Sequence, residues 1–178
     1  LSSEENRRLV TEGTAIALQI AMAGNLRSAI EICELVLEAG ALERLLIATD
    51  TPTGTGVVPL GMLHIMSELA SLGPLDARAV ISAATGNVAA VYGLASGRIA
   101  PGRPADLAVI DAPVGSIGED AFHAMTLGDV PAVACVVTGS CLSFGRSRNT
   151  PAPTRPINRL SIAIASQSGA RAQFIQGI

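Results

Sequence analysis

Lysine and tryptophan are absent from this sequence, and only 15% of its 178 residues are charged. Hydrophobic residues make up 49%, which excludes a disordered tail because such segments combine low hydrophobicity with high charge. All twelve cationic side chains are arginines, they form no basic run, and the net charge is -3. We therefore do not expect a nucleic-acid partner.

Cysteine is also scarce, since the three thiols are widely spaced and form no CxxC pair. This excludes a disulfide framework and a zinc knuckle, and we expect free thiols. Cys33 falls on an apolar helical stripe and is most simply a small buried hydrophobe. No apolar run approaches the roughly 20 residues of a membrane span, and no basic segment with a cleavage site begins the sequence. We expect a cytoplasmic protein without a membrane partner.

Aromatic residues amount to only 2%, so the core must be built from Ala, Val, Ile, Leu and Met. A composition this apolar is typical of strands that are buried on both faces and of helices that pack against other elements on several sides. It equally suits a piece of a larger protein whose remaining part covers some of the apolar surface, and we expect such a fragment. The first residue, Leu1, is not a methionine, which agrees with that expectation.

The first fifty residues alternate between two kinds of pattern. Polar, helix-compatible stretches are followed by unbroken apolar runs, and Asn25 and Gly40 are placed to begin and end the second helix. Apolar runs without alternation are typical of buried parallel strands. The predicted order is helix, strand, helix, strand, over residues 2–11, 14–23, 25–40 and 45–50. This order favours parallel βα units.

The remaining sequence changes character after Gly97. Before it, a Gly- and Pro-rich loop leads into helices that end at Gly73-Pro74 and begin again at the cap Asp76. After it, we predict two strands, a short helix between them, and a tight turn into a further strand, over residues 105–111, 132–138, 116–127 and 138–144. Prolines beyond Arg146 indicate an irregular tail.

Asp50 is the most informative single residue. It stands at the end of a predicted buried parallel strand and before a Gly-rich loop, which is where α/β barrels place catalytic groups. Burial near a metal or other carboxylates would adjust its pKa for proton transfer. An Asp before Thr-Pro also commonly caps a turn, and the spacing alone leaves both interpretations open.

The loop after Asp50 is a candidate substrate-binding segment. Thr53, Gly54, Thr55 and Gly56 offer hydroxyls and backbone N–H groups, although a plain flexible connection fits equally well. The loop is not a phosphate-binding P-loop, since it lacks the lysine and the glycine spacing. His64 and His123 each stand alone on a predicted helix, where a histidine is more often a surface or packing residue than a metal ligand.

Three stretches resemble the C-terminal part of the metal-dependent amidohydrolase superfamily. They lie at residues 47–61, 84–94 and 97–107, and they contain the series A-T-x-N, G-L and G-x-I-x-x-G-x-x-A-D-L. Within that superfamily the sequence is most similar to members that open a cyclic enamide, to which the stretch 147–151 also contributes. The resemblance covers roughly residues 2–155.

The resemblance implies an α/β fold: the last two βα units of a TIM (β/α)8 barrel, followed by strands of a small β-sandwich. The expected domains are a partial barrel with strands 7 and 8 at 1–96, a sandwich portion at 97–146, and a tail at 147–178.

The resemblance also implies a chemistry. Asp50 matches the strand-8 aspartate that binds the metal and moves protons, and zinc, possibly with iron in a binuclear centre, is the expected cofactor. A metal-bound hydroxide would attack the ring amide of 6-oxo-1,4,5,6-tetrahydronicotinate, which opens to 2-formylglutarate and ammonia. Thr53, Gly54, Thr55 and Gly56 would contact this substrate, and the intact enzyme would be a homo-oligomer.

The sequence departs from the family in its ligands. The HxH of strand 1, the bridging residue of strand 4 and the histidines of strands 5 and 6 have no counterpart, while a catalytic zinc normally has three protein ligands. We therefore expect a fragment that is inactive alone. The alternatives are an imidazolonepropionase- or dihydroorotase-like hydrolase, or a non-catalytic truncated homologue that acts by association through an exposed strand edge.

Overall fold

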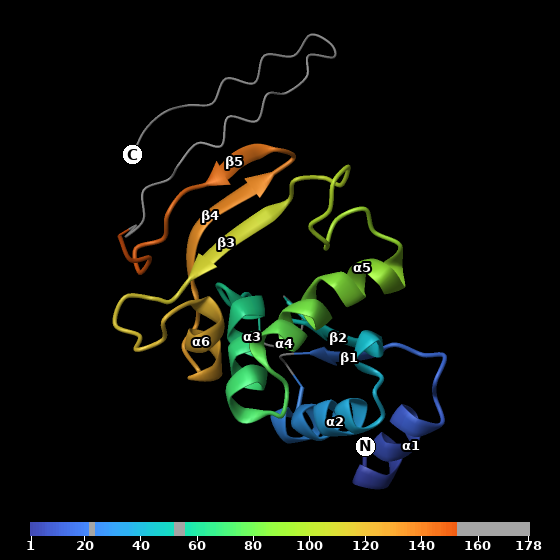
Figure 1. The fold of residues 1–178 in the computed structure, drawn as a ribbon. Helices are drawn as coiled ribbons and strands as arrows, with labels where there is room; N and C mark the ends of the chain where they lie inside the picture. Colours follow the sequence, from blue (N-terminus) through green and yellow to red (C-terminus); the bar gives the residue numbers. More distant parts are fainter. Residues whose placement is uncertain (22–23, 52–55, 153–178) are drawn as a thin grey trace.

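The computed structural model describes residues 1–21, 24–51 and 56–152, and it has two halves with one small sheet each (Figure 1). The first half contains α1, β1, α2, the 3-10 turn η1, β2, α3, α4 and α5. Their bounds are Ser3–Thr11, Leu18–Ala21, Leu26–Glu38, Leu42–Arg44, Leu45–Ala48, Gly61–Leu72, Ala77–Ala84 and Gly86–Tyr92. The second half contains β3, α6, β4 and β5, at Leu107–Asp111, Ala121–Thr126, Ala132–Thr138 and Cys141–Phe144.

The strands β1 and β2 pair in parallel, from Leu18 opposite Leu45 to Ala21 opposite Ala48. Helix α2 connects them, so this segment is a βαβ unit, as the alternation of apolar and polar runs predicts. Leu45, Leu46 and Ile47 of β2 have at most 3% of their surface exposed. A strand buried on both faces explains why its sequence is uniformly apolar.

The predicted helix starts are confirmed by side-chain caps. The Asn25 side-chain oxygen accepts a hydrogen bond from the Ser28 N–H at 3.1 Å, and Asp76 accepts one from the Ala79 N–H at 2.7 Å. Ser2 and Glu5 form a reciprocal capping box at the start of α1. These contacts satisfy N–H groups that a helix leaves without partners at its first turn.

Two predicted elements are much too long, and the strand expected over 45–50 also ends early, at Ala48. The strand expected over 14–23 is limited to Leu18–Ala21 within the described residues, because the chain turns at Gly13, whose carbonyl accepts from the Ile16 N–H at 3.1 Å. Residues 22–23 lie outside the described part. The helix expected over 116–127 is only Ala121–Thr126, since the preceding segment is occupied by a turn in which the Ser116 N–H bonds to the Pro113 carbonyl.

The core of the first half lies where α2, α3 and α4 pack on the two parallel strands. Its members are aliphatic or sulfur-containing, as the shortage of aromatic residues predicts. Those with no exposed surface are Cys33, Val36, Leu45, Leu69, Val80, Ala83 and Met125. Met125 comes from α6 of the second half, so this helix joins the same core and lies against α3 (Figure 1).

The second sheet is antiparallel, with the order β3-β4-β5. Its hairpin turn has positive φ at both central residues, 56° at Gly139 and 67° at Ser140, which is the geometry of a type I′ turn. Besides α6, a hydrogen bond at 3.0 Å from the Ser67 hydroxyl to the Asp129 carbonyl attaches this half to α3.

Arg44 ties the start of β2 to the segment that precedes β1. Its guanidinium donates to the carbonyls of Leu9, Val10, Gly13 and Ile16 at 2.6 to 3.2 Å. The first three carbonyls lie at the C-terminal end of α1, where helix carbonyls lack internal partners and a cation is favourable.

We predict that Arg44→Met destabilises the chain by about 2–4 kcal/mol, because several partly buried carbonyls lose a charged donor at once. The matched control is Arg8→Met. Arg8 pairs with Glu12 at the surface, where such pairs contribute about 0–1 kcal/mol. Urea denaturation followed by circular dichroism measures both. Equal changes for the two variants would contradict the structural role of Arg44.

Gly97 has no room for a side chain. A Cβ there would lie 2.7 Å from the Ala89 Cβ and 2.8 Å from the Thr85 carbonyl oxygen, and its φ is +85°. Gly102 has a similar φ of +81° with open space around it. We predict that Gly102→Ala costs about 1–2 kcal/mol, from backbone strain alone. Gly97→Ala should cost clearly more, and similar melting temperatures for the two variants would disprove the close approach.

Candidate functional site

The candidate site lies just beyond the carboxyl end of β2. This strand ends at Ala48, and Asp50 follows it as an exposed residue. Asp50 has a φ of +56°, an uncommon conformation for a residue with a side chain, although Asp adopts it more readily than most. Such backbone strain is concentrated at functional sites. The structure thus places Asp50 beyond the strand end, as predicted, and adds a left-handed turn that the sequence did not indicate.

The loop after Asp50 is only partly described. Thr53, Gly54 and Thr55, which the sequence indicates as substrate contacts, lie outside the described residues. Gly56 is described, is half-buried and has a φ of +77°. At the far end of the loop Leu60 has a φ of +57° and leads directly into α3. Asp50 and Leu60 therefore adopt left-handed conformations at the two ends of one connection.

A buried amide anchors β2 at the end opposite to Asp50. The Asn87 side-chain nitrogen donates to the carbonyls of Leu42 and Leu45 at 2.7 and 2.9 Å, and its oxygen accepts from the Ser82 hydroxyl at 3.3 Å. Only 7% of Asn87 is exposed. The sequence contains Asn87 within a recognisable motif, but nothing in the motif indicates that its partners are backbone groups more than forty residues away.

The two histidines do not join Asp50 in a cluster. His64 is exposed on α3. His123 is exposed on α6, and its ring Nδ1 accepts a hydrogen bond from the Glu119 N–H at 3.3 Å, a local contact at the start of a helix. In the part of the chain that the structure describes, no three His, Cys, Asp or Glu side chains are grouped to hold a metal ion. These residues therefore do not form a metal site by themselves.

The cysteines are all free in the structure, and their environments differ. Burial raises the pKa of the Cys33 thiol to about 12, with a smaller contribution from the Glu34 carboxylate. A thiol with so high a pKa is not a nucleophile at neutral pH. Cys33 is a core residue, which confirms the interpretation of its apolar stripe.

The stretch Ser147–Thr150 fastens the end of the described chain to β4. The buried Thr150 hydroxyl donates to the Val133 carbonyl at 2.9 Å, and the Ser147 N–H donates to the same carbonyl, also at 2.9 Å. These residues belong to the second half of the fold and have a structural role.

Across residues 1–21, 24–51 and 56–152, no helix combines the length and apolar character needed to cross a membrane.

Comparison with known proteins identifies the family. Residues 4–139 match the amidohydrolase family. The chain belongs to this family. Enamidase from Eubacterium barkeri is 40% identical to this amidohydrolase over 155 residues, which cover 87% of the chain and 40% of enamidase. A crystal structure of enamidase, described as a new member of the amidohydrolase superfamily, matches with a TM-score of 0.81 and 39% identity over the same shares.

The comparisons confirm the resemblance inferred from the motifs, and the mixed α/β fold agrees with it. This amidohydrolase chain spans about two fifths of the length of the enamidase that it matches.

The raised pKa of Cys33 predicts a pH dependence of stability. The pKa of the Cys33 thiol is about 12 in the folded chain and 9.0 ordinarily. Below pH 9 the thiol is therefore protonated in both states, and it causes no change of stability with pH. Between pH 9 and 12 the Cys33 thiol ionises only in the unfolded chain, so the free energy of unfolding should fall as the pH rises. This fall should be smaller in Cys33→Ala and unchanged in the exposed control Cys141→Ala. Urea denaturation at several pH values tests this, and a fall of equal size in all three proteins would refute it.

Proposed function

We propose that this chain contributes the proton-transferring aspartate, Asp50, to an enamidase-like hydrolase that opens a cyclic amide. The observation that carries the proposal is the place of Asp50 in a chain that is 40% identical to enamidase. It follows a buried parallel strand by two residues and has a left-handed backbone. In α/β barrels the groups at this end of the strands perform the chemistry.

We further propose that β1 and β2 correspond to strands 7 and 8 of a (β/α)8 barrel. In this assignment residues 1–96 belong to the barrel, 97–146 to a flanking β-sandwich, and 147–178 to a tail. The parallel register of β1 and β2 supports the first part of the assignment, and the separate antiparallel sheet supports the second.

Members of this superfamily typically use divalent metals. The described residues of this chain supply no group of three ligands, so they do not fit a metal site on their own. The remaining ligands would have to come from outside these residues. The chemistry assigned to this chain is therefore limited to what Asp50 itself can do as an acid and a base.

Asp50 is suited to move a proton between the two reacting groups. Its carboxylate would accept a proton from the water that attacks the ring carbonyl, and would deliver it to the ring nitrogen as the C–N bond breaks. For 6-oxo-1,4,5,6-tetrahydronicotinate the product is an enamine. Its hydrolysis by a second water gives 2-formylglutarate and ammonia. Gly56, within the same loop, would offer its backbone to this substrate.

A second candidate function, association without catalysis, is favoured by one observation. The described residues hold a single candidate catalytic carboxylate and no ligand group, while the strands β1 and β2 form a sheet of only two strands. A chain of this kind would be inactive alone and would act only with a partner. The two functions differ in the role of Asp50 when a partner supplies the rest of the fold. Asp50 is then required for activity in the first function and is not required in the second.

We predict that a chimera in which this chain replaces the matching region of the Eubacterium barkeri enamidase opens the lactam ring, while the isolated chain does not. Asp50→Asn in the chimera should lower kcat by about 10²–10⁴, the usual contribution of a positioned acid or base. Asp76→Asn is the matched control, because Asp76 caps α4 and Asn caps helices equally well.

Activity within a few-fold of the unsubstituted chimera after Asp50→Asn would disprove the assigned role. The chimera should also be assayed on a panel of lactams and cyclic imides. A preference for an imidazolone or a dihydroorotate-like imide would replace the proposed substrate and leave the role of Asp50 in place.

A further inference from the structure

Two threonine hydroxyls lie on either side of Asp50 in sequence and bond to each other. The Thr51 hydroxyl donates to the Thr49 hydroxyl oxygen, with 2.7 Å between the two oxygen atoms. Thr49 is half-buried and comes directly after β2, whereas Thr51 is exposed. This hydrogen bond therefore spans the residue to which the proposed function assigns proton transfer. We name the two side chains the Thr49–Thr51 bracket.

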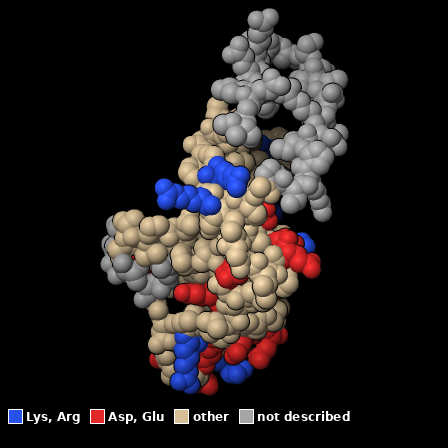
Figure 2. All heavy atoms as spheres, turned by 90° about the vertical axis from the view of Figure 1, so that its left-hand side faces the viewer, with Lys and Arg blue, Asp and Glu red and all other residues tan. Residues whose placement is uncertain are grey.

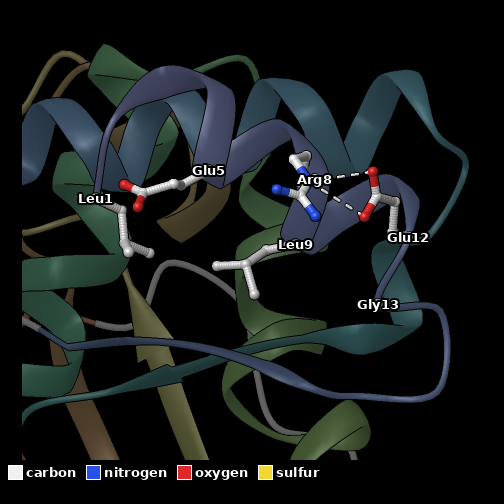
Figure 3. Close-up of a pocket in the computed structure, with 6 residues that line it drawn as sticks. All are labelled: Leu1, Glu5, Arg8, Leu9, Glu12 and Gly13. Atoms are coloured by element: carbon white, nitrogen blue, oxygen red, sulfur yellow. Dashed lines mark hydrogen bonds and ion pairs between the residues drawn. The ribbon is translucent and has the colours of Figure 1, made fainter.

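The bracket differs from side-chain pairs that support a helix. At α1, for example, Arg8 donates to Glu12 at 3.2 Å across one turn of the helix (Figure 3). Such a pair adds to a repeating structure that backbone hydrogen bonds already hold. The bracket lies in no helix or strand, and it spans a single residue whose φ is +56°. Its contribution is therefore to one backbone turn.

The left-handed turn at Asp50 and the bracket support each other. In an extended strand, residues i and i+2 point to the same face but lie roughly 6–7 Å apart. A turn at the intervening residue brings their side chains closer, and the oxygen–oxygen distance here is 2.7 Å. The hydrogen bond in return favours a backbone conformation that residues with a side chain adopt uncommonly. Loss of either hydroxyl should thus relax Asp50 towards an extended conformation.

The bracket is also neutral, so it holds the backbone without placing a charge beside the carboxylate. Charged side chains are few in this chain, and Figure 2 shows them scattered over a face that is mostly uncharged. A cation in the position of either threonine would attract the carboxylate of Asp50 and compete with the reacting groups for it. A pair of hydroxyl groups fixes the backbone without that competition.

We propose that Thr49 and Thr51 are positioning residues, which hold Asp50 in its left-handed conformation so that its carboxylate meets the attacking water and the ring nitrogen of a cyclic amide. The inference rests on the proposed function, because it gives the bracket a role in the proton transfer by Asp50. Neither threonine needs to touch the substrate. A general acid or base must lie within about 2.6–3.2 Å of the group that it serves, so a small change of backbone angle at Asp50 moves the carboxylate out of reach.

The test uses the chimera in which this chain replaces the matching region of the Eubacterium barkeri enamidase. Thr51→Val removes the hydroxyl and keeps the branched shape of the side chain. We expect kcat to fall about five- to a hundredfold, since a misplacement of about 1 Å costs on the order of 10²-fold, while KM changes less than about twofold. Thr51→Ser keeps the hydroxyl and should restore kcat to within about twofold of the unsubstituted chimera.

The matched control is Thr126→Val. The Thr126 hydroxyl also makes a hydrogen bond of 2.7 Å, to the His123 carbonyl at an exposed position on α6, and its loss should leave kcat within about twofold. Thr49→Val is a second variant of the bracket. The double variant of Thr49 and Thr51 should lose no more than either single variant, because the same hydrogen bond is removed in each case. Full additivity of the two losses would overturn the proposal.

A cycle with Asp50 separates positioning from a merely structural role. In the Asp50→Asn chimera, Thr51→Val should cause no further fall in kcat, because residues that act as a unit are not additive. A further fall as large as that in the unsubstituted chimera would overturn the positioning role. Unchanged kcat in Thr51→Val beside a large loss in Asp50→Asn would also overturn it and would leave the proposed function in place. Full activity of Asp50→Asn would overturn both.

A measurement without substrate follows the conformation itself. The NMR chemical shifts of the Asp50 backbone in this chain report its φ. We expect left-handed values that Thr51→Ser keeps and that Thr51→Val moves towards those of extended backbone, while Thr126→Val leaves them unchanged. Left-handed values that persist in Thr51→Val would contradict the bracket, whatever the change in kcat.

Discussion

The short turn at Leu42–Leu45 is the point on which the first half of the fold depends. From one side Arg44 reaches back to four carbonyls around the end of α1, and from the other the buried Asn87 amide bonds the carbonyls of Leu42 and Leu45. Burial of these carbonyls without hydrogen-bond donors would lower the stability of the fold. Here each donor lies far along the chain from the carbonyls to which it donates. The same few residues therefore hold α1, α5 and the start of β2 together.

In the proposed function, this constraint separates stability from chemistry along one strand. The start of β2 is fixed by Arg44 and Asn87, and its middle is packed on both faces. Its carboxyl end opens into a loop in which Asp50 and Leu60 have left-handed backbones. In barrel folds the amino ends of the strands serve stability and the carboxyl ends serve function. A strand that is fixed at its amino end can hold an exposed side chain at its carboxyl end in a defined position.

Local signals in the sequence predict the helices, strands and turns well. Contacts between distant residues account for features that the sequence does not predict. Asn25 and Asp76 cap helices as expected, and Gly139-Ser140 forms the expected tight turn, because each acts on its near neighbours. The strand predicted over 14–23 is too long because the chain turns at Gly13, and the Arg44 guanidinium, 28 residues from Ile16 in sequence, donates to the Ile16 carbonyl at this turn. The position of Asp50 follows from the apolar run before it, whereas its left-handed turn has no comparable local signature.

In the proposed function, the two-stranded sheet and the lack of a ligand group among the described residues are related. Strands of a parallel sheet bring their carboxyl ends to one edge, so a side chain at the end of β2 gains catalytic neighbours from the ends of other strands. Within the described residues β1 is the single strand beside β2, and no group of metal ligands is assembled there. A further parallel strand beside β1 would extend the row of strand ends to which Asp50 belongs. In the proposed function assembly and chemistry are thus coupled, because each strand added beside β1 would bring its own carboxyl end next to the end of β2.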